Sequence, residues 1–197
     1  MDDLHTGSVV DRARSLLGRT FTGHGVTVVL TEVEAYGGIE DPASHAFTRT
    51  PRSEVMYGPP GRLYVYRSYG IHFCANVVTG PTELAAAVLL RAGRVVEGHD
   101  LARERRGPVT DVQLARGPGN LAQALGITLD DLGTPVTTGA GPGLGERVED
   151  PEILAGPRVG VSLAADEPWR FWIAGDPTVS AYRRSPRARR ASPRRPQ

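Results

Sequence analysis

Two apolar runs near the middle of the chain are separated by only three residues. The runs cover residues 63–67 and 71–78, and the link between them is Ser68-Tyr69-Gly70. A link this short leaves antiparallel pairing as the way for two strands to join one sheet. Glycine in the link supplies the positive φ angle that a tight turn requires. The sequence therefore predicts a β-hairpin with Tyr69 near its tip.

Other apolar runs, rich in β-branched or aromatic residues, indicate further strands at residues 26–34, 88–92, 158–162 and 169–173. Short helices are expected where a run ends at glycine, at residues 9–17, 97–106 and 120–125. Glycine and proline make residues 37–61 irregular and indicate an exposed loop at 133–152. The pattern predicts strands mixed with short helices, without an internal repeat.

The chain has 197 residues and a mass of 21.1 kDa, which suits one core of ordinary size. No apolar run approaches the roughly 18 residues that a membrane span requires. The first residues lack the basic and apolar regions of a secretory signal. We therefore expect one domain over residues 1–182, a cytoplasmic location and no contact with a membrane.

All 23 basic residues are arginine, since the sequence contains no lysine. Chemistry that needs a lysine Schiff base or a phosphate-loop lysine is therefore excluded. Cys74 is the only cysteine, which excludes an internal disulfide and a multi-cysteine zinc site. It lies inside an apolar run, so we expect a packed, inert thiol rather than a nucleophile.

The last fifteen residues, 183–197, carry seven arginines and no acid. Since the formal charge of the whole chain is +1, the remainder carries about −6. A basic, proline-bearing segment on a weakly acidic body suggests a disordered tail that contacts phosphates. A solvated tail without a ligand is the alternative.

Five of the six tyrosines fall between residues 36 and 69. Side chains alternate across a strand, so Tyr36 shares a face with Glu34, and Tyr64 shares a face with Tyr66. Two strands that present rings beside a carboxylate would form a slot about one heterocycle thick, which points to nucleobase chemistry. The alternative is a set of ordinary core tyrosines.

An aromatic residue at a hairpin tip normally faces water and has no packing role. A ring on a stiff ribbon suits a wedge that enters a base stack and fills the space left by an extruded nucleotide. We expect Tyr69 to be such a wedge, and the alternative is that it folds back onto the hairpin. The turn Gly117-Pro118-Gly119 opens a helix whose N–H groups suit a phosphate.

These elements together resemble the methylpurine (3-methyladenine, or alkyladenine) DNA glycosylase family. The resemblance covers nearly all of the chain except its two ends and residues 133–152, and its most specific parts are Glu34-Ala35-Tyr36 and the hairpin from Tyr64 to Asn76. It implies an α+β fold, a single mixed domain around a curved antiparallel β-sheet with a protruding hairpin and surrounding short helices.

The resemblance also implies roles for individual residues. Glu34 matches the general base that activates water, Arg91 matches the arginine that supports this carboxylate, and Val159 falls where a main-chain carbonyl helps to hold the water. The residues that contact the flipped base are matched by Tyr36, His45, Tyr66 and the pocket-floor Asn76. The matched DNA contacts are Tyr69, Tyr64, Thr50, Arg52, Gly119 and Asn120. His72 departs from this pattern, because some relatives carry tyrosine at this position.

The function implied is a monofunctional DNA glycosylase that releases alkylated or deaminated purines from duplex DNA by base flipping and attack of water. We expect it to act in base excision repair as a monomer, with no metal and no organic cofactor. Two rivals stay open. One is a non-catalytic nucleic-acid-binding module, because the family's sheet is similar to the carboxy-terminal domain of methionyl-tRNA formyltransferases. The other is a nucleoside hydrolase.

Overall fold

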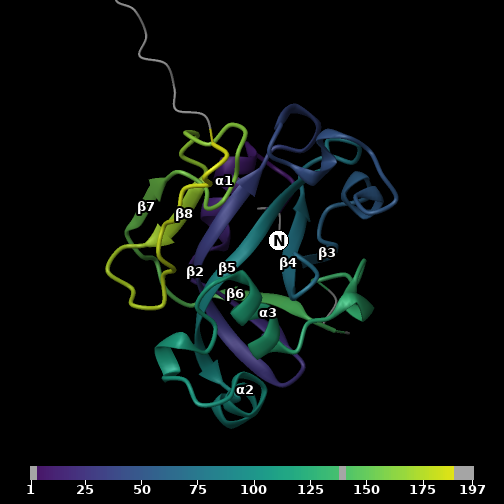
Figure 1. Ribbon diagram of the computed structural model, residues 1–197. Helices are drawn as coiled ribbons and strands as arrows, with labels where there is room; N and C mark the ends of the chain where they lie inside the picture. The colour runs from purple at the N-terminus through teal and green to yellow at the C-terminus, as the bar shows by residue number, and fades with distance from the viewer. Residues whose placement is uncertain (1–3, 138–140, 189–197) are drawn as a thin grey trace, which may run out of the picture.

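A computed structural model describes residues 4–137 and 141–188. In these ranges every strand pair of the sheet is antiparallel (Figure 1). The order along the sheet is β3-β4-β5-β2-β1-β6, and β8 pairs with both β2 and β7. The strands are β1 Arg19–Gly23, β2 Val26–Tyr36, β3 Leu63–Ser68, β4 His72–Thr79, β5 Ala86–Glu97, β6 Gly143–Arg147, β7 Ile153–Gly156 and β8 Arg170–Ile173. The predicted α+β fold around an antiparallel sheet is confirmed.

Strand β2 runs through the centre of this sheet (Figure 1). It pairs with β5 along nearly its whole length. Its other edge is shared between β1, which pairs with its first half, and β8, which pairs with its second half. All of its residues except Tyr36 are buried. A strand covered on both faces reads as a continuous apolar run, which explains why residues 26–34 were recognisable as a strand.

A β-bulge lies where β5 passes the second half of β2. Val33 pairs with Leu90 and Glu32 pairs with Ala92, so Arg91 is an extra residue between two regular pairs. A bulge bends the strand and re-aims the side chain of its extra residue. Here the re-aimed side chain is a buried arginine that reaches two carboxylates of β2.

Three short helices support the sheet: α1 Val9–Leu16, α2 His99–Arg106 and α3 Pro118–Leu125. Ser8 and Asp11 form a capping box at the start of α1, and Gly126 ends α3 in the left-handed conformation. Buried residues of α1 and α3 pack with sheet residues in one core. The short 3₁₀ segments are Gly38–Glu40, His45–Phe47, Glu54–Tyr57, Asp111–Gln113 and Leu129–Asp131.

The predicted hairpin is confirmed, and Ser68 pairs with His72 across a three-residue turn. The exposed loop predicted at 133–152 is wrong in part, because β6 lies within it and pairs with β1. Val136 and Leu144 from this segment are buried in the core. Its glycine and proline content concealed a strand whose partner lies more than 120 residues earlier in the chain.

The strand predicted at 158–162 is also wrong. Strand β7 lies earlier, at Ile153–Gly156, and Arg158 instead turns inward to a carboxylate. Gly160 has φ +73°, which interrupts an extended strand. The helix predicted from residue 97 begins at His99, because Glu97 ends β5 and Gly98 adopts the left-handed conformation between them.

Candidate active site

The floor of the candidate site is a row of side chains that crosses four strands. Tyr64 lies opposite Asn76, Asn76 opposite Leu89, and Leu89 opposite Glu34. Directly paired residues of neighbouring strands place their side chains on the same face of a sheet. These four residues line a cavity of about 590 Å³, which is large enough for a nucleobase.

Loops at the ends of the strands form the walls. They come from residues 42–45 and from residues 159–163, with the hairpin tip closing a third side. Ten of the thirteen predicted site residues line this cavity: Glu34, Tyr36, His45, Arg52, Tyr64, Tyr66, Tyr69, Asn76, Arg91 and Val159. The fold thus brings together residues that span more than 120 positions of the chain.

Glu34 is fully buried, and its carboxylate faces donors on both oxygens. The main-chain N–H of Val159 donates to Oε1 at 2.7 Å, and Arg91 Nη1 lies 3.3 Å from the same oxygen. The hydroxyl of Tyr36 donates to Oε2 at 2.8 Å. A carboxylate oxygen accepts about two hydrogen bonds, and Tyr36 supplies one of them to Oε2. The contact from Val159 is made by its N–H group, whereas the family resemblance implied a role for its carbonyl.

Desolvation of the Tyr36 phenol, which lies against Glu34, raises its pKa well above the ordinary value, and the charge of Glu34 adds to this effect. The phenol therefore stays protonated at neutral pH and keeps donating to Glu34. Arg158 stacks its guanidinium over the Tyr36 ring, 4.8 Å from the ring centre. The ring is thereby fixed beside the carboxylate.

The opposite wall carries three rings in mutual contact. His45 meets Tyr66 edge to face, with 4.6 Å between ring centres, and Tyr64 lies 5.6 Å from Tyr66. His45 Nδ1 is 3.0 Å from the hydroxyl of Tyr64. Arg52 lies over Tyr66 at 5.0 Å, on the rim of the cavity. These contacts fix the rings as one unit, and Asn76 is held on the floor by a hydrogen bond from its amide to the carbonyl of Tyr64.

The environment of His45 lowers its pKa from 6.5 to about 4. The main cause is partial desolvation of the ring in the cavity wall, and the second cause is the charge of Arg52. His45 is therefore neutral at pH 7 and does not repel a cationic heterocycle on electrostatic grounds.

We expect NMR titration of the His45 ring to give a midpoint near pH 4. As the pH falls below 6.5 the unfolded chain takes up this proton before the folded chain does. His45 therefore lowers the free energy of unfolding progressively as the pH falls from about 6.5 to about 4, and it has no such effect above pH 6.5. A His45→Gln variant should lose less stability than the wild type when the pH falls from 7 to 4, and a midpoint near 6.5 would contradict the buried environment.

Tyr69 projects from the hairpin tip with 94% of its surface exposed, and its φ angle is +49°. The alternative in which this ring folds back onto the hairpin is therefore wrong. A left-handed conformation is uncommon for a non-glycine residue and marks a position worth explaining. Ile71, at the other side of the turn, is also largely exposed.

Three predicted DNA contacts do not line the cavity. Thr50 lies in a turn with Ser53, to which it is hydrogen bonded. Asn120 donates to the carbonyl of Arg116 within the start of α3. Gly119 packs against His72 so closely that a Cβ at this position would lie 2.9 Å from the His72 Cβ. This close packing explains why position 119 is occupied by glycine.

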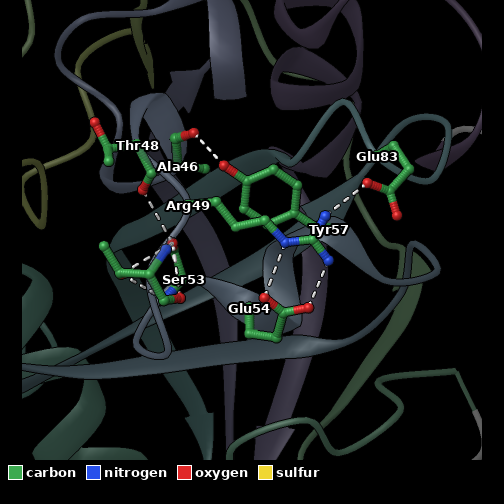
Figure 2. Close-up of polar contacts among 8 residues, drawn as sticks. Ala46, Thr48, Arg49, Ser53, Glu54, Tyr57 and Glu83 are labelled. Carbon is green, nitrogen blue, oxygen red and sulfur yellow. Dashed lines mark hydrogen bonds and ion pairs between the residues drawn. The ribbon is translucent and has the colours of Figure 1, made fainter.

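A cluster around Arg49 and Tyr57 holds the main chain next to His45, which is part of the cavity wall (Figure 2). Arg49 contacts both carboxylate oxygens of Glu54, reaches Glu83 at 3.0 Å, and covers the ring of Tyr57 at 4.4 Å. The hydroxyl of Tyr57 donates to the carbonyl of Ala46, next to His45, at 2.6 Å. The ion pairs are exposed and contribute little individually, so the buried tyrosine is the main anchor of this wall.

A buried ion pair that sequence reasoning did not assign joins the two loop walls. Asp41 accepts hydrogen bonds from both terminal nitrogens of Arg158, and both side chains are fully buried. The carboxylate also accepts from the main-chain N–H groups of Gly37 and Ala43. Since Arg158 precedes Val159, this pair fixes the main chain whose N–H contacts Glu34.

Glu32 is a second buried carboxylate behind the site, also without a predicted role. It accepts from Arg91 Nε at 2.9 Å, and Arg170 Nε lies 2.9 Å away. One signal was visible in the sequence, because Glu32 precedes Glu34 by two residues and thus shares its face of the strand. The partners of Glu32 lie far along the chain, and no local pattern points to them.

Comparison with known proteins agrees with this geometry. A family model described as methylpurine-DNA glycosylase (MPG) matches residues 3–177. Proteins of Mycobacterium leprae (strain Br4923) and Nocardia farcinica (strain IFM 10152) are each 56% identical, over 183 and 186 residues. Each alignment covers 89% of this chain, and they cover 86% and 88% of the two relatives. A protein of Rhodococcus jostii (strain RHA1) is 52% identical over 195 residues, 95% of this chain and 87% of the relative.

These three relatives are each named "Putative 3-methyladenine DNA glycosylase". The family match and the names of these relatives define the class as a DNA glycosylase, an N-glycosyl hydrolase of DNA repair, and a buried carboxylate beneath an aromatic cavity fits this class. The chain belongs to the methylpurine-DNA glycosylase family. The predicted family and enzyme class are thus confirmed. Within the described ranges, no helix is both long enough and apolar enough to cross a membrane.

Proposed function

We propose that the protein is a monofunctional glycosylase that hydrolyses the N-glycosidic bond of alkylated and deaminated purines in duplex DNA. The observation that carries this proposal is the position of Glu34, which is buried and lines an aromatic cavity. A carboxylate so placed suits a general base for a water molecule bound beside an extruded nucleotide.

In the proposed reaction Tyr69 enters the base stack while the damaged nucleotide rotates into the cavity. Tyr36 packs on one side of the extruded base, and His45 with Tyr66 packs on the other. Glu34 takes a proton from water, the water oxygen forms a bond to C1′ of the sugar, and the bonding electrons of the N-glycosidic bond leave with the purine. The product is an abasic site in an intact strand.

The cavity favours purines that carry a positive charge. Such bases are good leaving groups without further protonation, and they are attracted to electron-rich rings. A neutral His45 adds no repulsion, since its pKa lies near 4. The proposal therefore applies first to 3-methyladenine-type lesions, and neutral deaminated purines require a proton donor in addition.

We propose a cytoplasmic, nucleoid-associated location, because the proposed substrate is DNA, and we propose that the protein acts as a monomer. Arginines of the tail would add contacts to phosphates without sequence preference. Residues 189–197, which hold four of these arginines, lie outside the described residues.

A base-release assay tests the proposed function. The substrates are duplexes with one 3-methyladenine, 7-methylguanine, hypoxanthine or ethenoadenine, an undamaged duplex, and the corresponding free nucleosides. We expect release from at least one alkylated duplex and none from the nucleosides. Equal release from free nucleosides would favour the nucleoside hydrolase, and tight binding of DNA without release of any base would favour the non-catalytic module.

Truncation of the wedge should weaken binding to flipped DNA. We expect Tyr69→Ala to cost about 1–3 kcal/mol of affinity, the contribution of one aromatic stack on a base. The fold should tolerate the change, because the side chain is 94% exposed. Fluorescence anisotropy with a duplex that contains an abasic analogue measures the affinity, and Ile71→Ala is a matched control from the same turn. An unchanged Kd would exclude intercalation by Tyr69.

A further inference from the structure

The guanidinium of Arg91 is held at three corners, each by a different partner. Its Nε donates to Glu32 Oε1 at 2.9 Å, and its Nη1 faces Glu34 Oε1 at 3.3 Å. Its Nη2 donates to the hydroxyl of Ser180 at 3.1 Å. A planar guanidinium with all three nitrogens engaged has one orientation. Ser180 therefore helps to decide whether Nη1 points at Glu34.

Ser180 is itself fixed by the carboxylate behind the site. Its main-chain N–H donates to Glu32 Oε2 at 2.7 Å, and its hydroxyl donates to Glu32 Oε1 at 2.9 Å. Just before it, Thr178 is buried and its hydroxyl lies 2.7 Å from that of Thr31 on β2. The half-buried hydroxyl of Ser180 thus joins two buried charged groups, Glu32 and Arg91, and its loss leaves both with one polar partner fewer.

The same segment reaches the loop that supplies the other donor to Glu34. The carbonyl of Arg183 accepts from the N–H of Gly160 at 3.0 Å, one residue after Val159. Arg184 pairs with Asp166 at 2.6 Å, beyond the turn of the same loop. This ion pair is exposed and weak, but the main-chain bond fixes Gly160, which has a positive φ angle.

We propose that residues 178–184, which we name the C-terminal strap, position the carboxylate of Glu34 for catalysis. The strap fixes Arg91 through Ser180 and fixes the loop of Val159 through the carbonyl of Arg183. It lies beyond residue 177, where the match to the family model ends. Ser180 does not line the cavity, so it is a positioning residue that acts through Arg91. The inference rests on the proposed function, in which Glu34 is the base.

Ser180→Ala tests the strap with the least disturbance, because it keeps the main-chain contacts and removes only the bridging hydroxyl. Without that hydroxyl Arg91 can turn away from Glu34, and small displacements of catalytic groups lower the rate steeply. We expect the single-turnover rate on the best lesion duplex to fall about tenfold per folded molecule. The Kd for a duplex with a tetrahydrofuran abasic analogue should stay within about twofold, and Ser180→Thr should restore most of the rate.

Ser185→Ala is the matched control, because its hydroxyl only accepts a local hydrogen bond from Arg187 outside the site. A Ser180→Ala rate equal to that of this control would overturn the proposal. So would a rate loss that Ser180→Thr does not rescue, or one that follows a loss of DNA affinity, because a general structural role would produce either. Glu34→Gln is measured alongside, so that failure of the strap proposal can be told apart from failure of the proposed function. If Glu34→Gln is inactive while Ser180→Ala is fully active, only the strap proposal fails. If Glu34→Gln is fully active, the proposed chemistry fails.

Discussion

A Glu34→Gln variant is expected to excise damaged purines at least about 10²-fold more slowly than the wild type, the lower range for loss of a general base. The amide has nearly the shape of the carboxylate but cannot take a proton from water. Glu34 accepts from Val159 and Tyr36 on different oxygens, so one of these donors will face the NH₂ group of glutamine. The Tyr36 hydroxyl can rotate and accept instead, which lets the variant fold.

The measurement is the single-turnover rate on a lesion duplex, with the Kd determined in parallel. Lesion binding should survive, since the aromatic cavity and the wedge are unchanged. Glu104→Gln is a suitable control because this carboxylate is exposed on α2, away from the cavity. A Glu34→Gln enzyme with a near-normal rate would show that another group activates the nucleophile.

The second large effect is expected on stability, from Asp41→Asn. This change leaves the buried guanidinium of Arg158 without a counter-charge, and loss of one partner of a buried ion pair typically costs about 3–5 kcal/mol. It also places an NH₂ group against donors, because Asp41 accepts from Arg158, Gly37 and Ala43 on its two oxygens. Urea unfolding at pH 7 measures the loss.

The same variant should slow excision, because Asp41 and Arg158 join the two loops that wall the cavity and Val159 follows Arg158 in the chain. Asp111→Asn is the control. That carboxylate is paired with Arg103 at an exposed position, where loss of a pair costs up to about 1 kcal/mol. If Asp41→Asn were no more costly than this control, the buried pair would not anchor the loops.

Local patterns in the sequence were sufficient for the hairpin and for β2. The hairpin follows from a three-residue link, and β2 follows from an apolar run that a strand buried on both faces requires. Strands β6 and β7 escaped prediction because they are short and gain their stability from partners elsewhere in the chain. At residues 158–162 an extended pattern was overridden by the long-range attraction between Arg158 and Asp41, which lie 117 positions apart.

Part of the candidate site could also be predicted from local patterns, and part could not. Alternation along the strands placed Tyr36 beside Glu34, and the family resemblance named the residues that line the cavity. The polar groups that fix them were not assigned, because Ser180 and Glu32 meet across 148 positions of the chain. Burial of such groups depends on their tertiary partners, and a single sequence shows neither the burial nor the partner.

The identity of the nucleophile tests the central claim most directly. A glycosylase that attacks with an amine forms a Schiff base with the sugar. The given sequence contains no lysine, so the α-amino group at Met1 is its only aliphatic amine. The wild-type enzyme is incubated with a lesion duplex in the presence of borohydride, and base release, strand cleavage and covalent adducts are measured in the same sample. Water activated by Glu34 predicts base release, an intact strand that breaks only after alkali or heat, and no adduct. An adduct formed in proportion to the released base would contradict hydrolysis by water.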